Sequence, residues 1–314
     1  MRAECLHQDQ RHRIMLFRGT GDGQRAVVSF EHGRDQHMSG FEPASCPRFA
    51  RRLGVDALMV QTARRDWFVS DRSAALAEAL ARATAGYAEV IAIGFSMGGY
   101  AALLYSAACH ARRVMAVSPQ YCIDPQVAPF DPGRHAKFAR IGRPMPLPQS
   151  QGDIGVDGLL LYDPAIAADR AHAALIRVGF PRLTAVALPH GGHPATGVIA
   201  GAGGVGQLAE MVIVNRIDPA RVRQAHRAAR RDSALYRLHL AKAALARHPD
   251  RAKRELRALA AGAAPRQAFE AALLLLEQRD DQAEALLSRV LEAEPQIPPG
   301  LLRRLDRALR DGGI

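Results

Sequence analysis

One short segment constrains the fold of this chain more than any other. Residues 90–104 begin as an apolar, β-type run, pass through Gly94-Phe-Ser96-Met-Gly98 and continue as small, helix-favouring residues. A Gly-x-Ser-x-Gly pattern between a strand and a helix is typical of a nucleophile elbow. Such a tight turn leaves no room for side chains at the two glycines, and it raises the serine hydroxyl above the end of the strand. The segment therefore predicts a strand–turn–helix unit that exposes Ser96 at the C-terminal edge of a sheet.

Further strands and helices are expected to alternate around this unit. Short apolar runs predict strands at residues 14–17, 26–30, 55–61, 90–94, 113–118, 158–162 and 183–188, with alanine-rich helices before residue 85 and near residues 101–110 and 167–178. Because strands and helices alternate from residue 55 to residue 188, we expect an α/β fold with a mainly parallel, doubly wound sheet. The first two runs are joined by a glycine-rich segment, so they are expected to form a hairpin.

The sequence also indicates two parts of different character. Residues 1–215 form the expected α/β domain, in which residues 119–157 have no clear period and are expected to form a lid or substrate loop. Residues 216–314 have the spacing of amphipathic helices, at 233–247, 251–261, 266–277 and 281–292. The last pair resembles a tetratricopeptide-type helical hairpin, and residues 233–261 resemble a more degenerate copy. We therefore expect a small all-α helical-hairpin extension, which is a candidate surface for a protein partner.

Composition narrows the class of protein. The formal net charge is +11, and residues 216–257 hold 13 basic against 4 acidic residues. Since only three of the 42 basic residues are lysines, the bias indicates solvated helix faces rather than a nucleic-acid partner. The four cysteines are far apart, and no signal-like or membrane-spanning run is found. We expect a cytoplasmic protein with reduced thiols, no transmembrane segment, no metal site and no cofactor.

A serine nucleophile needs a base to accept its proton and a third group to orient that base. Asp163 follows the expected strand at residues 158–162, and His190 and His193 follow the strand at 183–188. Asp124 is an alternative acid, whereas Asp169 is interpreted as the N-cap of the next helix. The chain thus supplies Ser, Asp and His in the order that a nucleophile elbow requires.

Together these features resemble the α/β-hydrolase superfamily over residues 14–215. The resemblance implies that Ser96 is the nucleophile and Asp163 the acid. It favours His193 over His190 as the base, because the base of this superfamily usually follows glycine. It also implies an oxyanion hole made by the backbone amide of Met97.

The second oxyanion donor is expected at Phe30 or Glu31, in the Phe-Glu-His-Gly segment after an early strand. His32, Trp67 and His190 are candidate substrate contacts, although each has a structural interpretation as well. The Gly-x-Gly-x-x-Gly pattern at residues 201–206 is interpreted as the glycine-rich start of a helix, because too few residues follow it for a dinucleotide-binding crossover.

The resemblance predicts a serine hydrolase that cleaves an ester or thioester through an acyl-enzyme, with a small-molecule or glycan-linked acyl substrate. Acyl transfer by the same triad is one alternative. A catalytically idle platform whose helical repeats bind a protein partner is the other.

Overall fold

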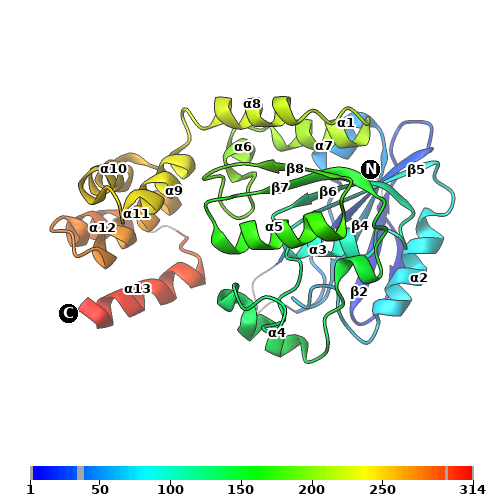
Figure 1. Cartoon of the computed structure of the whole chain (residues 1–314), viewed down its shortest axis with the longest axis horizontal. Coiled ribbons are helices and arrows are strands. Elements are labelled where there is room, and N and C mark those ends of the chain that lie inside the picture. Colours follow the sequence, from blue (N-terminus) through cyan, green and yellow to red (C-terminus); the bar gives the residue numbers. More distant parts are fainter. Residues whose placement is uncertain (1–2, 34–38, 294–295, 313–314) are drawn as a thin grey trace.

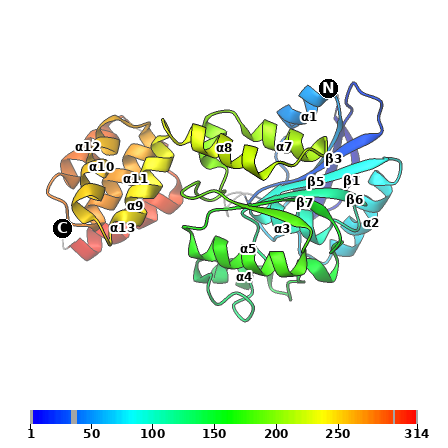
Figure 2. The ribbon, with the colours of Figure 1, turned by 45° about the horizontal axis from the view of Figure 1, so that its top comes forward.

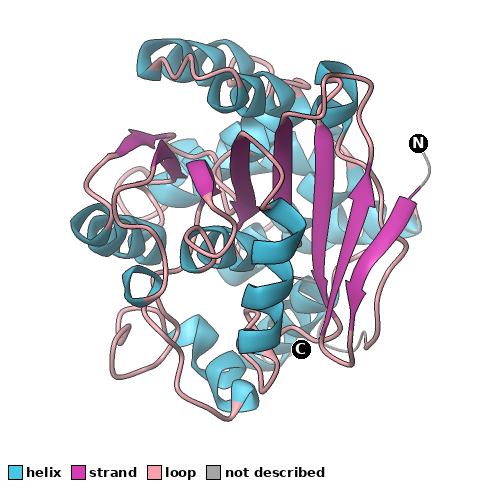
Figure 3. Ribbon diagram, turned by 90° about the vertical axis from the view of Figure 1, so that its right-hand side faces the viewer, coloured by secondary structure: helices cyan, strands magenta, loops and turns pink. Residues whose placement is uncertain are grey.

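The computed structural model describes residues 3–33, 39–293 and 296–312. Eight strands form one sheet in the order β1-β2-β4-β3-β5-β6-β7-β8, with helices on both faces (Figures 1 and 3). The strands are β1 (Ala3–Gln8), β2 (His12–Phe17), β3 (Arg25–Phe30), β4 (Asp56–Thr62), β5 (Glu89–Phe95), β6 (Ala111–Val117), β7 (Asp157–Tyr162) and β8 (Leu183–Ala187). Strands β3 to β8 run parallel to one another, which confirms the predicted mainly parallel sheet.

The predicted hairpin between residues 14–17 and 26–30 is wrong. Strand β2 pairs antiparallel with β1 on one side and with β4 on the other, so β4 separates β2 from β3. The glycine-rich joint packs against the turn before β4: the Gly21 amide donates to the Gly54 carbonyl at 2.8 Å, and the Gly19 amide donates to Asp56 Oδ1 at 2.6 Å. These glycines therefore allow a close crossing of two loops rather than a two-strand turn.

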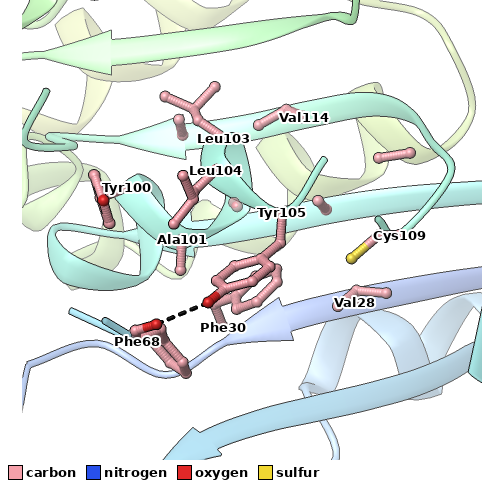
Figure 4. Packing of buried hydrophobic residues seen from close by; sticks show 14 of the residues in the cluster. Val28, Phe30, Phe68, Tyr100, Ala101, Leu103, Leu104, Tyr105, Cys109 and Val114 are labelled. Atoms are coloured by element: carbon pink, nitrogen blue, oxygen red, sulfur yellow. Dashed lines mark hydrogen bonds between the residues drawn. The ribbon is translucent and has the colours of Figure 1, made fainter. Parts of the chain in front are cut away.

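Each face of the sheet is covered by helices that contribute to a separate hydrophobic core. Helices α2 (Ser73–Thr84), α3 (Met97–Leu104) and α5 (Ala167–Gly179) pack on one face. Helices α1 (Arg48–Leu53), α6 (Gly197–Gly201), α7 (Val205–Ile213) and α8 (Pro219–Ala229) pack on the other. Figure 4 shows part of the first core, where Tyr105 stacks on Phe30 and its hydroxyl donates to the Phe68 carbonyl at 2.8 Å.

The strand order creates a change of direction next to β5. From β3 the chain moves outward to β4, and it then returns past β3 to β5 and continues to β8 on the other side. At such a switch point the loops that follow neighbouring strands separate, and a crevice opens at the carboxyl ends of the strands. Ser96 directly follows β5 at this point.

The segment 119–157 lies over this end of the sheet. It contains the 3-10 turn η1 (Pro132–Arg134), helix α4 (His135–Ile141) and a second 3-10 turn, η2 (Pro148–Ser150). The Tyr100 hydroxyl of α3 donates to the Pro146 carbonyl at 2.7 Å, so the segment is fixed to the helix that follows Ser96. The segment thereby places the N-terminus of α4 at the predicted site.

The C-terminal helices form a separate cluster, as Figure 2 shows. Helices α9 (Ala234–Ala244), α10 (Pro249–Gly262), α11 (Pro265–Glu277), α12 (Ala283–Glu292) and α13 (Pro299–Gly312) share a third core. The first four correspond to the four predicted helices. Val222 of α8 lies in the core of the sheet instead. The change of core thus falls between α8 and α9, later than the predicted boundary at residue 215.

Candidate active site

Ser96 occupies a strained turn between β5 and α3. Its φ of 51° and ψ of −117° are values that side-chain-bearing residues rarely adopt, and such a conformation costs about 1–3 kcal/mol. A Cβ on Gly94 would overlap the Gly98 carbonyl, and a Cβ on Gly98 would lie 2.5 Å from the Phe30 carbonyl oxygen. Both glycines of the motif are therefore required by backbone contacts within the turn and to β3.

His193 connects Ser96 to a buried carboxylate. The Nε2 atom of His193 lies 2.8 Å from Ser96 Oγ, and its Nδ1 atom lies 2.9 and 3.0 Å from the two carboxylate oxygens of Asp169. Since the carboxylate accepts at Nδ1, the neutral imidazole has its proton there and presents the Nε2 lone pair to the serine hydroxyl. This arrangement can accept the serine proton.

The structure contradicts the prediction that Asp163 orients His193. The Asp163 carboxylate, 1% exposed, accepts the backbone amides of Ala165, His190 and Gly192 at 2.9–3.0 Å. Because these bonds tie the end of β7 to the loop after β8, Asp163 shapes the loop that carries the histidine rather than contacting its ring.

The prediction that Asp169 is the N-cap of the next helix is also wrong. The N-cap of α5 is Ile166, and Asp169 is the third helical residue. Its side chain points inward and is almost fully buried against His193. A sequence signal did exist, because Asp169 lies in the first turn of the helix that follows β7. Spacing alone could not distinguish it from Asp163.

Gln120 contacts the nucleophile and is not among the residues that the sequence predicts at the site. Its Nε2 donates to Ser96 Oγ at 3.2 Å, and its Oε1 accepts the indole N–H of Trp67 at 3.0 Å. Trp67 is only 1% exposed, so the expected substrate contact at this residue is contradicted. The tryptophan instead fixes the amide that touches the nucleophile.

Arg134 is the second unpredicted residue at the site. Its Nη2 lies 3.2 Å from His193 Nε2, which places a guanidinium beside the serine hydroxyl. Its Nη1 donates to Asp131 at 2.7 Å, and Asp131 in turn lies 3.0 Å from His172 Nε2. Asp131 and His172 are buried, so the guanidinium is held in place by a polar chain inside the protein.

The predicted oxyanion donors differ in their availability. The first intrahelical bond of α3 runs from the Tyr100 amide to the Ser96 carbonyl, so the Met97 amide precedes the hydrogen-bonded turns of the helix. The Glu31 amide donates to the Val60 carbonyl at 3.0 Å, which excludes it as a free donor. Phe30 lies within β3, between β4 and β5, and its carbonyl faces Gly98. His32, the next residue, is exposed and lies outside the strands.

The loop that carries His193 contacts helices α8 and α9. The His190 carbonyl lies 3.2 Å from His239 Nδ1 of α9, and the His190 ring packs edge-on against Tyr236. The Pro189 carbonyl lies 3.0 Å from His226 Nε2 of α8. Burial lowers the pKa of His190. His190 thus connects the loop to the C-terminal helices, and His193 is the histidine that lies against Ser96.

No group of metal-ligating side chains is found within the part of the chain that the structure describes. The glycine-rich residues 201–206 span the end of α6 and the start of α7, in agreement with their interpretation as a helix start. None of the described helices is long and apolar enough to cross a membrane.

The parallel sheet, the elbow after β5 and the histidine after β8 define the α/β-hydrolase fold. The sequence matches no protein-family model and no curated protein. Solved structures similar to this chain include an esterase of Pyrobaculum calidifontis (18% identity, 69% of this chain and 85% of that chain, TM-score 0.45). An esterase of Pyrococcus furiosus has 12% identity over 68% of this chain and 90% of that chain, with a TM-score of 0.43. The capsule O-acetyltransferase of Neisseria meningitidis serogroup A has 10% identity over 62% and 91%, with a TM-score of 0.42.

Proposed function

We propose that this chain is a serine hydrolase that cleaves an acyl ester or thioester. The observation that carries the proposal is the hydrogen-bonded chain from Ser96 Oγ through His193 to Asp169, with distances of 2.8 and 2.9 Å. A nucleophile, a base and an orienting carboxylate in this geometry are the requirements for covalent acyl transfer to serine.

In this mechanism His193 Nε2 accepts the proton of Ser96 as the hydroxyl oxygen attacks the acyl carbonyl. Asp169 holds the imidazole and stabilises the imidazolium that forms. The oxyanion is stabilised by the Met97 amide at the start of α3 and by an amide after β3, for which we propose His32. The imidazolium protonates the leaving group, and a water molecule activated by the same histidine releases the acid.

The alternative of an idle platform is not favoured, because a platform needs neither the strained Ser96 nor a buried carboxylate on His193. Acyl transfer differs from hydrolysis only in the acceptor of the acyl group. Product analysis with and without an added alcohol acceptor distinguishes the two.

A fluorophosphonate probe tests the proposal. We expect one label per chain in the native protein and none in Ser96→Ala or His193→Ala. Lys242→Ala, which changes an exposed residue of α9, is the control and is expected to label normally. A folded native protein that is never labelled would refute the proposal.

A further inference from the structure

A strongly basic cavity is lined in part by α4, the helix that begins directly after Arg134 of the candidate active site. It has a volume of about 400 Å³ and lies between α4 and the loop after β4. Its basic lining residues are Arg11, Arg64, Arg65, Lys137, Arg140 and Arg143.

Asp66 is the one carboxylate among the described residues that line the cavity. It accepts the Thr62 hydroxyl at 2.8 Å and the Phe68 amide at 3.0 Å. Burial raises its pKa to about 6, so it offsets little of the surrounding charge in weakly acidic solution. Arg11 pairs with Asp71 at 3.2 Å, but the other basic lining residues still outnumber Asp66, so the described lining carries a net positive charge.

Lys137 shows how closely these cations are packed. The side chain is half-buried on α4, and burial together with Arg65, Arg134 and Arg140 lowers its pKa to about 8, against a smaller opposing effect of Asp131. Desolvation and like-charge repulsion both disfavour a protonated lysine in this place. A bound anion would offset the like-charge repulsion on Lys137.

Helix α4 connects the basic cavity with the candidate active site. Arg134 stands at the head of α4, three residues before Lys137, so the two lie on one face of the helix. Arg134 contacts His193, as described above. Arg65 lies against the loop that follows β3, because a Cβ on Gly33 would lie 3.0 Å from Arg65 Nε. Cationic side chains thus lead from Arg134, beside His193, to Lys137 in the cavity.

We propose that this cavity binds a phosphate-type group of the substrate, so that Ser96 acts on esters or thioesters whose acyl or leaving part is phosphorylated. The inference rests on the proposed function for the role of Ser96. A phosphate has a charge near −2 and three strong acceptor oxygens, which suits several cations that approach from different segments. A single carboxylate has one charge and two acceptor oxygens, so it matches this set of cations less closely than a phosphate does.

Direct binding tests the cavity without depending on catalysis. Inorganic pyrophosphate is titrated calorimetrically into the native chain, Lys137→Ala, Lys137→Arg and Lys242→Ala. We expect one saturable site, weakened at least tenfold in Lys137→Ala, largely restored in Lys137→Arg and unchanged in Lys242→Ala. Added salt should weaken it, because the interaction is ionic. Absence of binding, or equal binding in all variants, would overturn the proposal.

Kinetics then test whether the bound anion belongs to the substrate. The native chain is compared on S-acetylpantetheine and on its 4′-phosphate, which have the same thioester. We expect kcat/KM to be at least tenfold higher for the phosphorylated substrate, and this ratio to fall towards one in Lys137→Ala but not in Lys242→Ala. Equal kcat/KM values in the native chain would overturn the proposal.

The two proposals fail in different ways. If the native chain is not labelled by fluorophosphonate, the proposed function fails, and the pyrophosphate titration still decides whether the cavity binds anions. If the chain is labelled but neither binds pyrophosphate nor prefers the phosphorylated thioester, the anion proposal fails and the serine hydrolase remains.

Discussion

The two aspartates that follow β7 provide the sharpest test of the site. Both carboxylate oxygens of Asp169 contact His193 Nδ1, whereas the Asp163 carboxylate accepts hydrogen bonds from backbone amides only. Replacing each by asparagine keeps its size and removes its charge. The structure therefore predicts that the two substitutions affect different quantities, catalysis in one case and stability in the other.

Asp169→Asn is expected to reduce kcat by about 10⁴-fold, the loss known for this change in a Ser-His-Asp triad, where the histidine adopts the wrong tautomer. At about 1.4 kcal/mol per tenfold, this corresponds to roughly 5.5 kcal/mol of transition-state stabilisation. Because Asp169 is also buried, a thermal unfolding curve must accompany the measurement to show that the variant is folded.

Asp163→Asn retains one oxygen that accepts the amides of Ala165 and His190, but it turns an N–H₂ group towards the Gly192 amide. One charge-assisted hydrogen bond is lost, which is worth about 1.5–3 kcal/mol of unfolding free energy. We expect a lower melting temperature and a smaller loss of kcat than in Asp169→Asn.

The assay is the hydrolysis of a neutral chromogenic acetate ester, with kcat measured well below the melting temperature of each variant. Full activity in Asp169→Asn together with complete loss in folded Asp163→Asn would refute the geometry described here and restore the sequence-based assignment.

Three further outcomes are expected. Gly98→Ala should prevent fluorophosphonate labelling and destabilise the fold, measured by thermal unfolding, because its Cβ would meet the Phe30 carbonyl at 2.5 Å. His239→Ala should lower kcat severalfold, because it removes the side chain that contacts the His190 carbonyl. Fluorophosphonate labelling of Ser96 should remain, and an unchanged kcat would show that α9 does not position the loop. The affinity for pyrophosphate should fall as pH rises through about 8, because Lys137 loses its proton there. The charged groups around Lys137 are Arg65, Arg134, Arg140, Asp131 and Asp66. An affinity that does not change with pH would contradict this prediction.

The sequence by itself determined the features that depend on short segments. The elbow around Ser96 is encoded by two glycines whose backbone contacts allow no side chain, so its pattern is visible without a structure. The alternation of β-type and helical periods predicts the mainly parallel sheet, and amphipathic spacing predicts helices α9 to α12. Each of these depends on residues that are close neighbours along the chain.

Only the tertiary structure decided which distant side chains meet. Asp163 and Asp169 both follow β7, and their assignment depends on how the loop after β8 folds over the helix start. Gln120 and Arg134 reach Ser96 and His193 from a segment without periodicity, so no local pattern marks them. The lateral order of the strands was likewise decided by long-range pairing, which a period along the chain does not record.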